Sequence, residues 1–259
     1  MPAEHEGRST RRGSAIVLAA LLLSAACGPK PPAAVLLFDG AGTSRGDVSA
    51  FERLLDANGI AFERVDSARI ESLGAAEIQA RRLLIVPGGN FVEMSRALSP
   101  AARVRVQEAV ANGWNYLGVC AGAFLAGSSP VGSNRLEPHF DGFDLASGMA
   151  FGFSEASARG IRKAPVWVKT ADGTALEQYW EDGPALAGWG AVVGTYPDGT
   201  PAIVEGSCGA GRVLLCGVHS EAPESWREGM SFTTPASADN SYAVMLIRAL
   251  LEGRPLAHW

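Results

Sequence analysis

The chain has 259 residues, of which 47% are hydrophobic and 19% are charged, and its formal net charge is −5. This composition is that of an ordinary globular protein, with one large domain or two small ones and enough apolar residues for a full core. Basic residues do not run together with aromatic residues as they do in nucleic-acid-binding proteins, so the sequence predicts no DNA or RNA partner.

The N-terminal segment has the pattern of an export signal. Arginines between residues 8 and 12 precede an uncharged run over residues 13–26. This run is shorter than the roughly 20 residues that span a bilayer. It ends as LLLSAAC, which resembles a bacterial lipobox, although Ser24 stands where leucine is usual. We expect a lipoprotein signal peptide over residues 1–26 and a lipidated Cys27 that tethers the protein to a bacterial envelope membrane, on the periplasmic or extracytoplasmic side. The alternatives are a secreted protein without lipid and an uncleaved anchor.

Residues 27–33 are rich in proline and predict a stiff, extended spacer. A single domain is expected to follow over residues 34–259. Its first part alternates short apolar strands with helices, which predicts βαβ units and a parallel sheet. The expected strands cover residues 34–38, 61–65 and 83–86 and a run from 115 to a turn at 120, and the expected helices cover residues 48–58, 69–81 and 100–112.

Loops at the ends of these strands are candidates for ligand contact, because the carboxyl ends of parallel strands line the ligand crevice in such sheets. The loop over residues 39–47 offers Ser44 and Arg45 as polar groups, or it is a flexible connection in which Asp47 caps the next helix. The third strand ends in a turn over residues 87–90. Two glycines in this turn let the backbone approach a ligand with its N–H groups unobstructed.

Cys120 follows the fourth strand directly, in the sequence GVCAGA. Gly118 and Gly122 allow a sharp turn there, as at a nucleophile elbow between a strand and a helix. The N-terminus of the following helix carries a partial positive charge that favours a thiolate. The N–H groups of Ala121 and Gly89 are candidates for an oxyanion hole. Alternatively, Cys120 is a small buried hydrophobic residue.

The second part of the chain predicts a mainly antiparallel extension joined by turns such as PDG and GAG. Residues 129–163 are rich in glycine and carry no assignment, and they can form a wall or lid over Cys120. The expected strands cover residues 166–169, 178–180, 191–196, 201–207 and 211–218, and a C-terminal helix covers residues 241–251 with Asp239 or Asn240 as its cap.

The last of these strands leads to His219, and Glu221 follows two residues later. Side chains at i and i+2 of an extended segment share a face, so Glu221 can hold the imidazole while the ring faces Cys120. A cysteine nucleophile needs a base, and the base needs an orienting group. The three residues therefore predict a Cys-His-Glu triad.

The elbow GVCAGA, the strand end LLIVPGGN and the segment VLLCGVHSE together resemble the class I glutamine amidotransferase-like superfamily. Within it, the chain is most similar, over about residues 34–226, to the domain at the N-terminus of eukaryotic biotin-protein ligases. The resemblance implies an α/β fold with a flavodoxin-like parallel sheet, flanking helices and an antiparallel extension. It implies the same triad, and an oxyanion role for the glycine turn.

We expect Gly88, Asn90 and Phe124 to contact the substrate. Glutamine-hydrolysing members of the superfamily usually carry glutamine four residues after the nucleophile, where this chain has Phe124. The departure argues against glutamine as the substrate and leaves the thiol chemistry in place.

No cofactor or metal is predicted, because the histidines are widely spaced, CxxC and HxxxH are absent, and the glycine-rich loops match neither the P-loop nor the dinucleotide fingerprint. In a tight hairpin, Cys208 and Cys216 would lie roughly 13 Å apart, beyond the roughly 7 Å between bridged Cα atoms. We therefore expect no disulfide between them.

The sequence thus predicts an exported, membrane-tethered cysteine amide hydrolase that acts on a small amide or peptide. The main alternative is a periplasmic binding module that keeps the same pocket without turnover. A third is a scaffold for envelope proteins in which Cys120 is incidental. The sequence identifies no protein partner.

Overall fold

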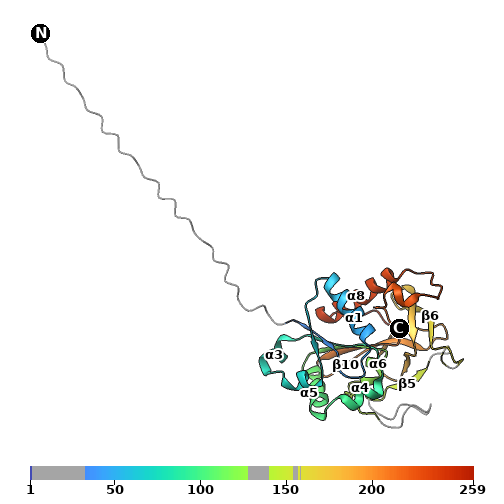
Figure 1. The fold of residues 1–259 in the computed structure, drawn as a ribbon, viewed down its shortest axis with the longest axis horizontal. Coiled ribbons are helices and arrows are strands. Elements are labelled where there is room, and N and C mark those ends of the chain that lie inside the picture. Colours follow the sequence, from blue (N-terminus) through green and yellow to red (C-terminus); the bar gives the residue numbers. More distant parts are fainter. Residues whose placement is uncertain (2–32, 128–139, 154–156, 158) are drawn as a thin grey trace. The chain divides into compact units, whose positions relative to one another are not determined.

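A nine-stranded mixed sheet forms the centre of the computed structural model (Figure 1). The strand order is β2-β1-β3-β4-β11-β10-β9-β6-β7. Neighbours from β2 to β11 are parallel, and neighbours from β11 to β7 are antiparallel. The predicted parallel sheet with an antiparallel extension is confirmed. The strands of this sheet are β1 (Val35–Phe38), β2 (Phe62–Val65), β3 (Leu83–Val86), β4 (Asn115–Val119), β6 (Lys163–Thr170), β7 (Ala175–Glu181), β9 (Ala191–Thr195), β10 (Pro201–Cys208) and β11 (Gly211–Cys216), and β5 (Ala150–Phe153) pairs separately with β8 (Pro184–Ala187).

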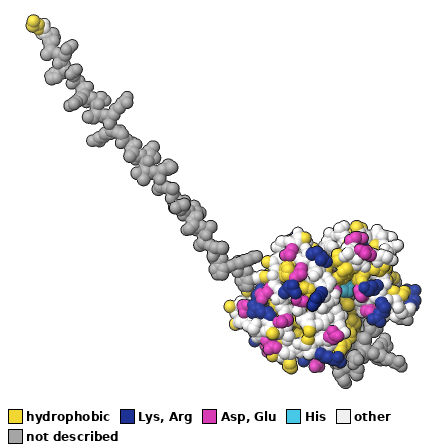
Figure 2. Space-filling view, viewed as in Figure 1, with side chains coloured by type: hydrophobic (Ala, Val, Ile, Leu, Met, Phe, Trp, Pro, Cys, Tyr) yellow, Lys and Arg dark blue, Asp and Glu magenta, His cyan; other side chains and the backbone are white. Residues whose placement is uncertain are grey.

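The structure describes residues 1, 33–127, 140–153, 157 and 159–259. The predicted signal peptide, Cys27 and nearly all of the predicted spacer lie outside these residues, so those predictions stay predictions. Among the described residues, no helix combines the length and the apolar character needed to cross a membrane. Acidic and basic side chains are interspersed over the face of the domain seen in Figure 2.

Helices cover both faces of the sheet (Figure 1). On one face lie α1 (Arg45–Ala57) and α8 (Ala236–Glu252), which contact each other. The other face carries α2 (Ser67–Ser72), α3 (Ala75–Ala80), α4 (Phe91–Ala97) and α5 (Pro100–Ala111), and the short α6 (Ala121–Leu125) follows β4. The apolar residues of the central strands are buried on both faces of the sheet, as in parallel sheets covered by helices on two sides. Val35 and Leu37 of β1 pack toward α1 and α8, whereas Leu36 and Phe38 pack on the opposite face.

Several element boundaries differ from the predicted ones. The helix expected over residues 69–81 is two helices, because Leu73 has an extended backbone and Gly74 begins α3. The expected C-terminal helix begins earlier, at Ala236, with Pro235 as its N-cap, so neither Asp239 nor Asn240 is the cap. Strand β5 lies in the segment that had no assignment, and α4 and β8 were not expected.

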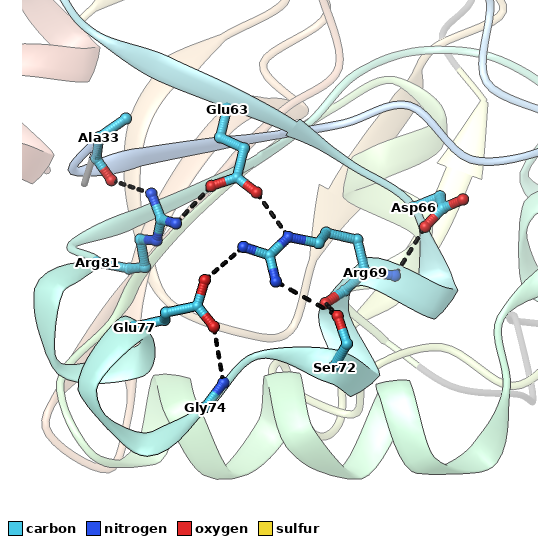
Figure 3. A network of polar contacts seen from close by, with 8 residues as sticks. All are labelled: Ala33, Glu63, Asp66, Arg69, Ser72, Gly74, Glu77 and Arg81. Carbon is cyan, nitrogen blue, oxygen red and sulfur yellow. Dashed lines mark hydrogen bonds and ion pairs between the residues drawn. The ribbon is translucent and has the colours of Figure 1, made fainter. Parts of the chain in front are cut away.

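A network of charged side chains fixes the region where the described domain begins (Figure 3). Arg69 bonds Glu63 at 2.7 Å and also pairs with Glu77. Arg81 pairs with the other oxygen of Glu63 and donates to the Ala33 carbonyl oxygen at 2.5 Å. The network thereby joins β2, α2 and the end of α3 to Ala33, two residues before β1.

A second buried ion pair closes the loop between β11 and α8. Arg227 pairs with Asp239 of α8, and their side chains are 3% and 0% exposed. The guanidinium also donates to the Thr234 carbonyl oxygen at 2.6 Å and lies 4.1 Å from the centre of the Phe232 ring. These contacts hold the loop that carries Trp226 against the site described below.

The hairpin of β10 and β11 separates the two remaining thiols. Cys208 lies opposite Gly211, whereas Cys216 lies opposite Ile203. Both cysteines are free, and this register matches the offset expected from a tight hairpin.

Candidate active site

The predicted site residues meet at the carboxyl ends of the central parallel strands. Cys120 follows β4, the glycine turn follows β3, and His219 and Glu221 follow β11. This edge is where open α/β sheets bind their ligands. The site therefore draws on segments that lie far apart in the sequence.

Cys120 occupies a strained turn. Its φ of 51° and ψ of −108° lie outside the regions that L-residues ordinarily adopt. The predicted elbow is therefore present, but the strain falls on Cys120 itself and not on the two flanking glycines. Gly118 and Gly122 serve close packing: a Cβ on Gly122 would lie 1.9 Å from the Val86 carbonyl oxygen, and one on Gly118 would lie 2.4 Å from the Gly122 carbonyl oxygen.

The thiol of Cys120 lies in the wall of a cavity of about 570 Å³. Its Sγ atom donates a long hydrogen bond of 3.5 Å to the Glu181 carbonyl oxygen, at the end of β7. The lining residues are Ser44, Asp47, Gly89, Asn90, Phe91, Cys120, Ala121, Phe124, Ser157, Arg162, Glu181, Asp182 and His219. Cys120 and His219 therefore share one cavity, as the triad requires.

His219 and Glu221 form the predicted hydrogen bond. Nδ1 of His219 lies 2.9 Å from Oε1 of Glu221, and both side chains are buried. The Nε2 atom on the other side of the ring is buried and has no hydrogen-bond partner among the described residues. One nitrogen is thus held by a carboxylate while the other stays available.

Asp47, which the sequence suggested only as a helix cap, is a further member of the site. Its Oδ1 lies 3.2 Å from Nδ1 of His219. Ser44 is the N-cap of α1, because its hydroxyl oxygen accepts a hydrogen bond from the Asp47 N–H. Capping by Ser44 frees the Asp47 carboxylate to face the histidine. Arg45, the other polar candidate in this loop, does not line the cavity.

Burial and neighbouring charges shift the pKa values of His219, Glu221 and Asp47. Burial lowers the pKa of His219, but the charge of Glu221 and the contacts with Asp47 and Cys120 outweigh it and raise the pKa well above its ordinary value. Burial raises the pKa of Glu221, and this effect exceeds the attraction of His219. For Asp47, burial is outweighed by His219, Ser44 and Gly88, so its pKa is lowered.

The backbone N–H groups of Gly89 and Ala121 are the two expected donors of the oxyanion hole. Thr43 and Gly89 form an antiparallel bridge, in which the Ser44 N–H donates to the Gly88 carbonyl oxygen and the Asn90 N–H donates to the Gly42 carbonyl oxygen. The Gly89 N–H takes no part in this bridge and points away from it. Ala121 is the first residue of α6 and has no acceptor within its own helix. Both residues line the cavity, as an oxyanion hole requires.

The three expected substrate contacts have different surroundings. Asn90 lines the cavity, but its side-chain oxygen caps α4 by accepting from Val92 and Glu93. Phe124 also lines the cavity while it stacks on Phe91, with ring centroids 4.5 Å apart.

Gly88 is not among the residues that line the cavity, and it packs behind Asp47 and His219. A Cβ there would lie 2.2 Å from Asp47 Oδ1. Gly88 therefore has a packing role, and its expected substrate contact stays a prediction.

Two aromatic residues enclose His219 and were not predicted as part of the site. The Tyr179 ring lies 5.8 Å from the imidazole and its backbone oxygen accepts from the His219 N–H at 2.9 Å. Trp226 packs edge-on against the same ring at 5.8 Å. Adjacent aromatic residues in a strand usually belong to the hydrophobic core. This holds for Trp180, and for this reason the contact between Tyr179 and His219 was not predicted.

Three side chains of the site, Asp47, His219 and Glu221, are of types that can bind metals, and their ligand atoms lie within 4.8 Å of one another. Both carboxylates approach the same nitrogen, Nδ1 of His219, at 3.2 Å and 2.9 Å. The arrangement is that of a hydrogen-bonded acid–base cluster.

The sequence matches the family described as "Biotin-protein ligase, N terminal" over residues 33–249. The chain belongs to this family. Its match includes the glycine turn, the elbow and the histidine segment, so the resemblance predicted from these motifs is confirmed. No curated protein matches the chain.

Solved structures share the fold of this family member at low sequence identity. An exo-β-1,4-mannosidase from Opitutaceae bacterium strain TAV5 matches with a TM-score of 0.52 and 13% identity, covering 83% of this chain and 36% of the enzyme. The chain thus spans about a third of that enzyme's length. A glutamine amidotransferase from Thermotoga maritima matches with a TM-score of 0.45 and 14% identity, covering 85% of this chain and 88% of that one. At 13% identity, the likeness to the mannosidase concerns the fold alone.

Proposed function

We propose that this class I glutamine amidotransferase-like protein is a cysteine amide hydrolase that acts on a small amide or peptide. The observation that carries the proposal is the placing of Cys120, at a strained strand-to-helix turn, in one cavity with a buried histidine whose Nδ1 is held by Glu221. Strain and buried charge are costly, and they concentrate at functional sites.

In this proposal Cys120 attacks the amide carbonyl carbon. The N–H groups of Gly89 and Ala121 stabilise the oxyanion, and His219 carries protons between the sulfur, the leaving nitrogen and water. The resulting thioester is then hydrolysed. The cavity of about 570 Å³ suits a small ligand, whose sites typically span about 300–1,000 Å³.

The packing of Phe124 supports a substrate other than glutamine. Phe124 is 2% exposed and forms part of an aromatic cluster with Phe91 and Phe151. It offers an apolar surface at the position where glutamine-hydrolysing relatives carry a carboxamide.

The test is hydrolysis of a panel of small primary amides and short peptides by wild type and Cys120→Ala. Loss of the nucleophile is expected to reduce kcat by a factor on the order of 10⁴ or more. Cys208→Ala is the matched control, because that thiol lies outside the cavity, and its activity should equal that of wild type. Tight binding of an amide without turnover by wild type would favour the binding module instead.

We further propose that the protein is exported and held at a bacterial envelope membrane by a lipidated Cys27. The support is the N-terminal pattern of arginines, apolar run and lipobox-like sequence. The intact mass of detergent-extracted protein is expected to be that of a chain that begins at an acylated Cys27. A soluble product cleaved elsewhere would contradict the anchor and leave the amide chemistry untouched.

A further inference from the structure

Asp47 brings a second carboxylate to the nitrogen that Glu221 already holds. Asp47 Oδ1 lies 3.2 Å from Nδ1 of His219, and Glu221 Oε1 lies 2.9 Å from the same atom. The Asp47 and Glu221 side chains are 9% and 1% exposed. Nδ1 carries a single hydrogen, and Asp47 Oδ1 has no hydrogen-bond donor of good geometry among the described residues. Asp47 therefore acts on the ring mainly through its charge.

Two features of the fold hold this carboxylate in place. Asp47 is in the first turn of α1, where its backbone N–H bonds the Ser44 hydroxyl at 3.3 Å. Gly88 leaves the room it needs, since a Cβ there would lie 2.2 Å from Asp47 Oδ1 and 2.9 Å from Cε1 of His219. The aspartate and the histidine can meet only because position 88 has no side chain.

Among the described residues, the titratable groups around the ring are Asp47 from α1, Cys120 from the elbow, Tyr179 from β7, Tyr196 beyond β9, Cys216 from β11 and Glu221, and none of them is a lysine or an arginine. Glu181, Asp182 and Arg162 line the same cavity, where Arg162 pairs with Asp182. Burial raises the pKa of both tyrosines and of Cys216, so these groups are neutral near pH 7. Two buried carboxylates thus face one imidazole, and a positive ring is the charge state that balances them best.

We propose that Asp47 is a second positioning residue of the site, which shares His219 Nδ1 with Glu221 and keeps the ring as an imidazolium beside Cys120 before substrate binds. The catalytic meaning of this arrangement rests on the proposed amide hydrolysis, but the charge state itself requires no substrate. In the resting site the proton is on His219, and the imidazolium replaces the Glu181 oxygen as the partner of the sulfur.

This charge state fixes the order of proton transfers. The thiolate forms the C–S bond to the carbonyl carbon, and His219 Nε2 gives its proton to the leaving nitrogen as the C–N bond breaks. The neutral ring then takes a proton from water as the water oxygen attacks the thioester. The C–S bond breaks, the carboxylic acid leaves, and the thiolate and imidazolium are restored. His219 therefore acts first as an acid and second as a base.

The decisive measurement is nitrogen NMR of the His219 imidazole in the full chain, without substrate. In wild type the ring is expected to remain doubly protonated at about pH 7.5, above the ordinary histidine pKa of about 6.5. Asp47→Asn keeps the shape and removes the charge, so the titration midpoint should fall by roughly 1–3 units, the usual effect of an opposite charge within about 4–6 Å. Iodoacetamide labelling of Cys120 at about pH 6.5 should slow by about tenfold or more in the same variant.

Asp198→Asn is the matched control. Asp198 lies in the exposed turn after β9, outside the cavity, where it accepts hydrogen bonds from Thr200, so its loss should leave the His219 titration and the labelling unchanged. Asp47→Ser provides a second neutral variant if the asparagine does not fold. The proposal is overturned if wild type has a neutral ring at about pH 7.5, or if a folded Asp47 variant titrates like the control. If the Asp47-dependent shift is present but no amide is hydrolysed, the proposed function fails and this inference stands.

Discussion

Replacing His219 with alanine is expected to slow iodoacetamide labelling of Cys120 at about pH 6.5 by tenfold to a hundredfold. An ordinary cysteine, with a pKa of about 8.5, is only about 1% thiolate at this pH. In the proposed charge state, the buried His219 is a positively charged ring beside the thiol, and alanine removes that charge. The measurement is the labelling rate at each cysteine, followed by peptide mass spectrometry between about pH 5 and 9.

The other thiols provide internal controls in the same protein. Cys216 is 2% exposed and burial raises its pKa, so it should label slowly in every variant. The pKa of Cys208 is also raised by burial, and this residue lies away from the histidine. Glu221→Gln should have a smaller effect than His219→Ala, because Asp47 remains beside the ring. Equal labelling of Cys120 in wild type and His219→Ala would show that the two residues are uncoupled, and the binding module would then replace the enzyme.

The second large effect is expected from Asp239→Ala, which should lower the free energy of unfolding by about 3–5 kcal/mol. Arg227 and Asp239 are almost completely buried, and removing one partner leaves the other charge without compensation. Glu252→Ala is the matched control, because Glu252 pairs with Arg254 at 3.4 Å while both side chains are about half exposed. Such a surface pair contributes at most about 1 kcal/mol. The free energy of unfolding is measured by urea unfolding of wild type, Asp239→Ala and Glu252→Ala. An equal loss of stability in the two variants would contradict a special contribution of the buried pair.

The pH dependence of the same pair has a definite sign. Burial outweighs the attraction of Arg227 and raises the pKa of Asp239 to about 7. A group whose pKa is raised on folding stabilises the fold most below its unfolded pKa, and this contribution is lost as the pH rises through the folded value. Relative to Asp239→Asn, wild type should therefore lose stability between about pH 4 and about pH 7. If the difference in stability between wild type and Asp239→Asn stayed constant across this range, the raised pKa of Asp239 would be contradicted.

The middle of the sheet was predictable because β1, β3 and β11 contain continuous apolar runs. Such runs occur where a strand is buried on both faces. Cys120 and His219 could be found for the same reason, since each directly follows such a run. The helix boundaries were harder to predict from the sequence. Asp239 resembles an N-cap in sequence, but in the fold it lies inside the first turn of α8 and binds Arg227.

The residues that enclose His219 could not be predicted from the sequence. Asp47, Tyr179 and Trp226 contact His219 from three different elements, and no spacing along the chain links them to it. Asp47 in particular follows a loop rich in glycine and small polar residues, where a capping role explains an aspartate well enough. Gly88 gives the one local signal of this packing. A glycine before Gly89 is required only if another group packs against position 88, and here Asp47 and His219 do so.

The position of β11 in the sheet has a consequence for the order of folding. This strand is among the last in the chain, yet it lies in the middle of the sheet, between β4 and β10. Contacts between segments so distant in sequence form slowly, because loop closure must come first. Until β11 docks, Cys120 can already sit at the end of β4 but has neither His219 nor the carboxylates behind it. If His219 activates the sulfur as proposed, that activation is coupled to completion of the fold, because an unfinished chain has the cysteine without its histidine.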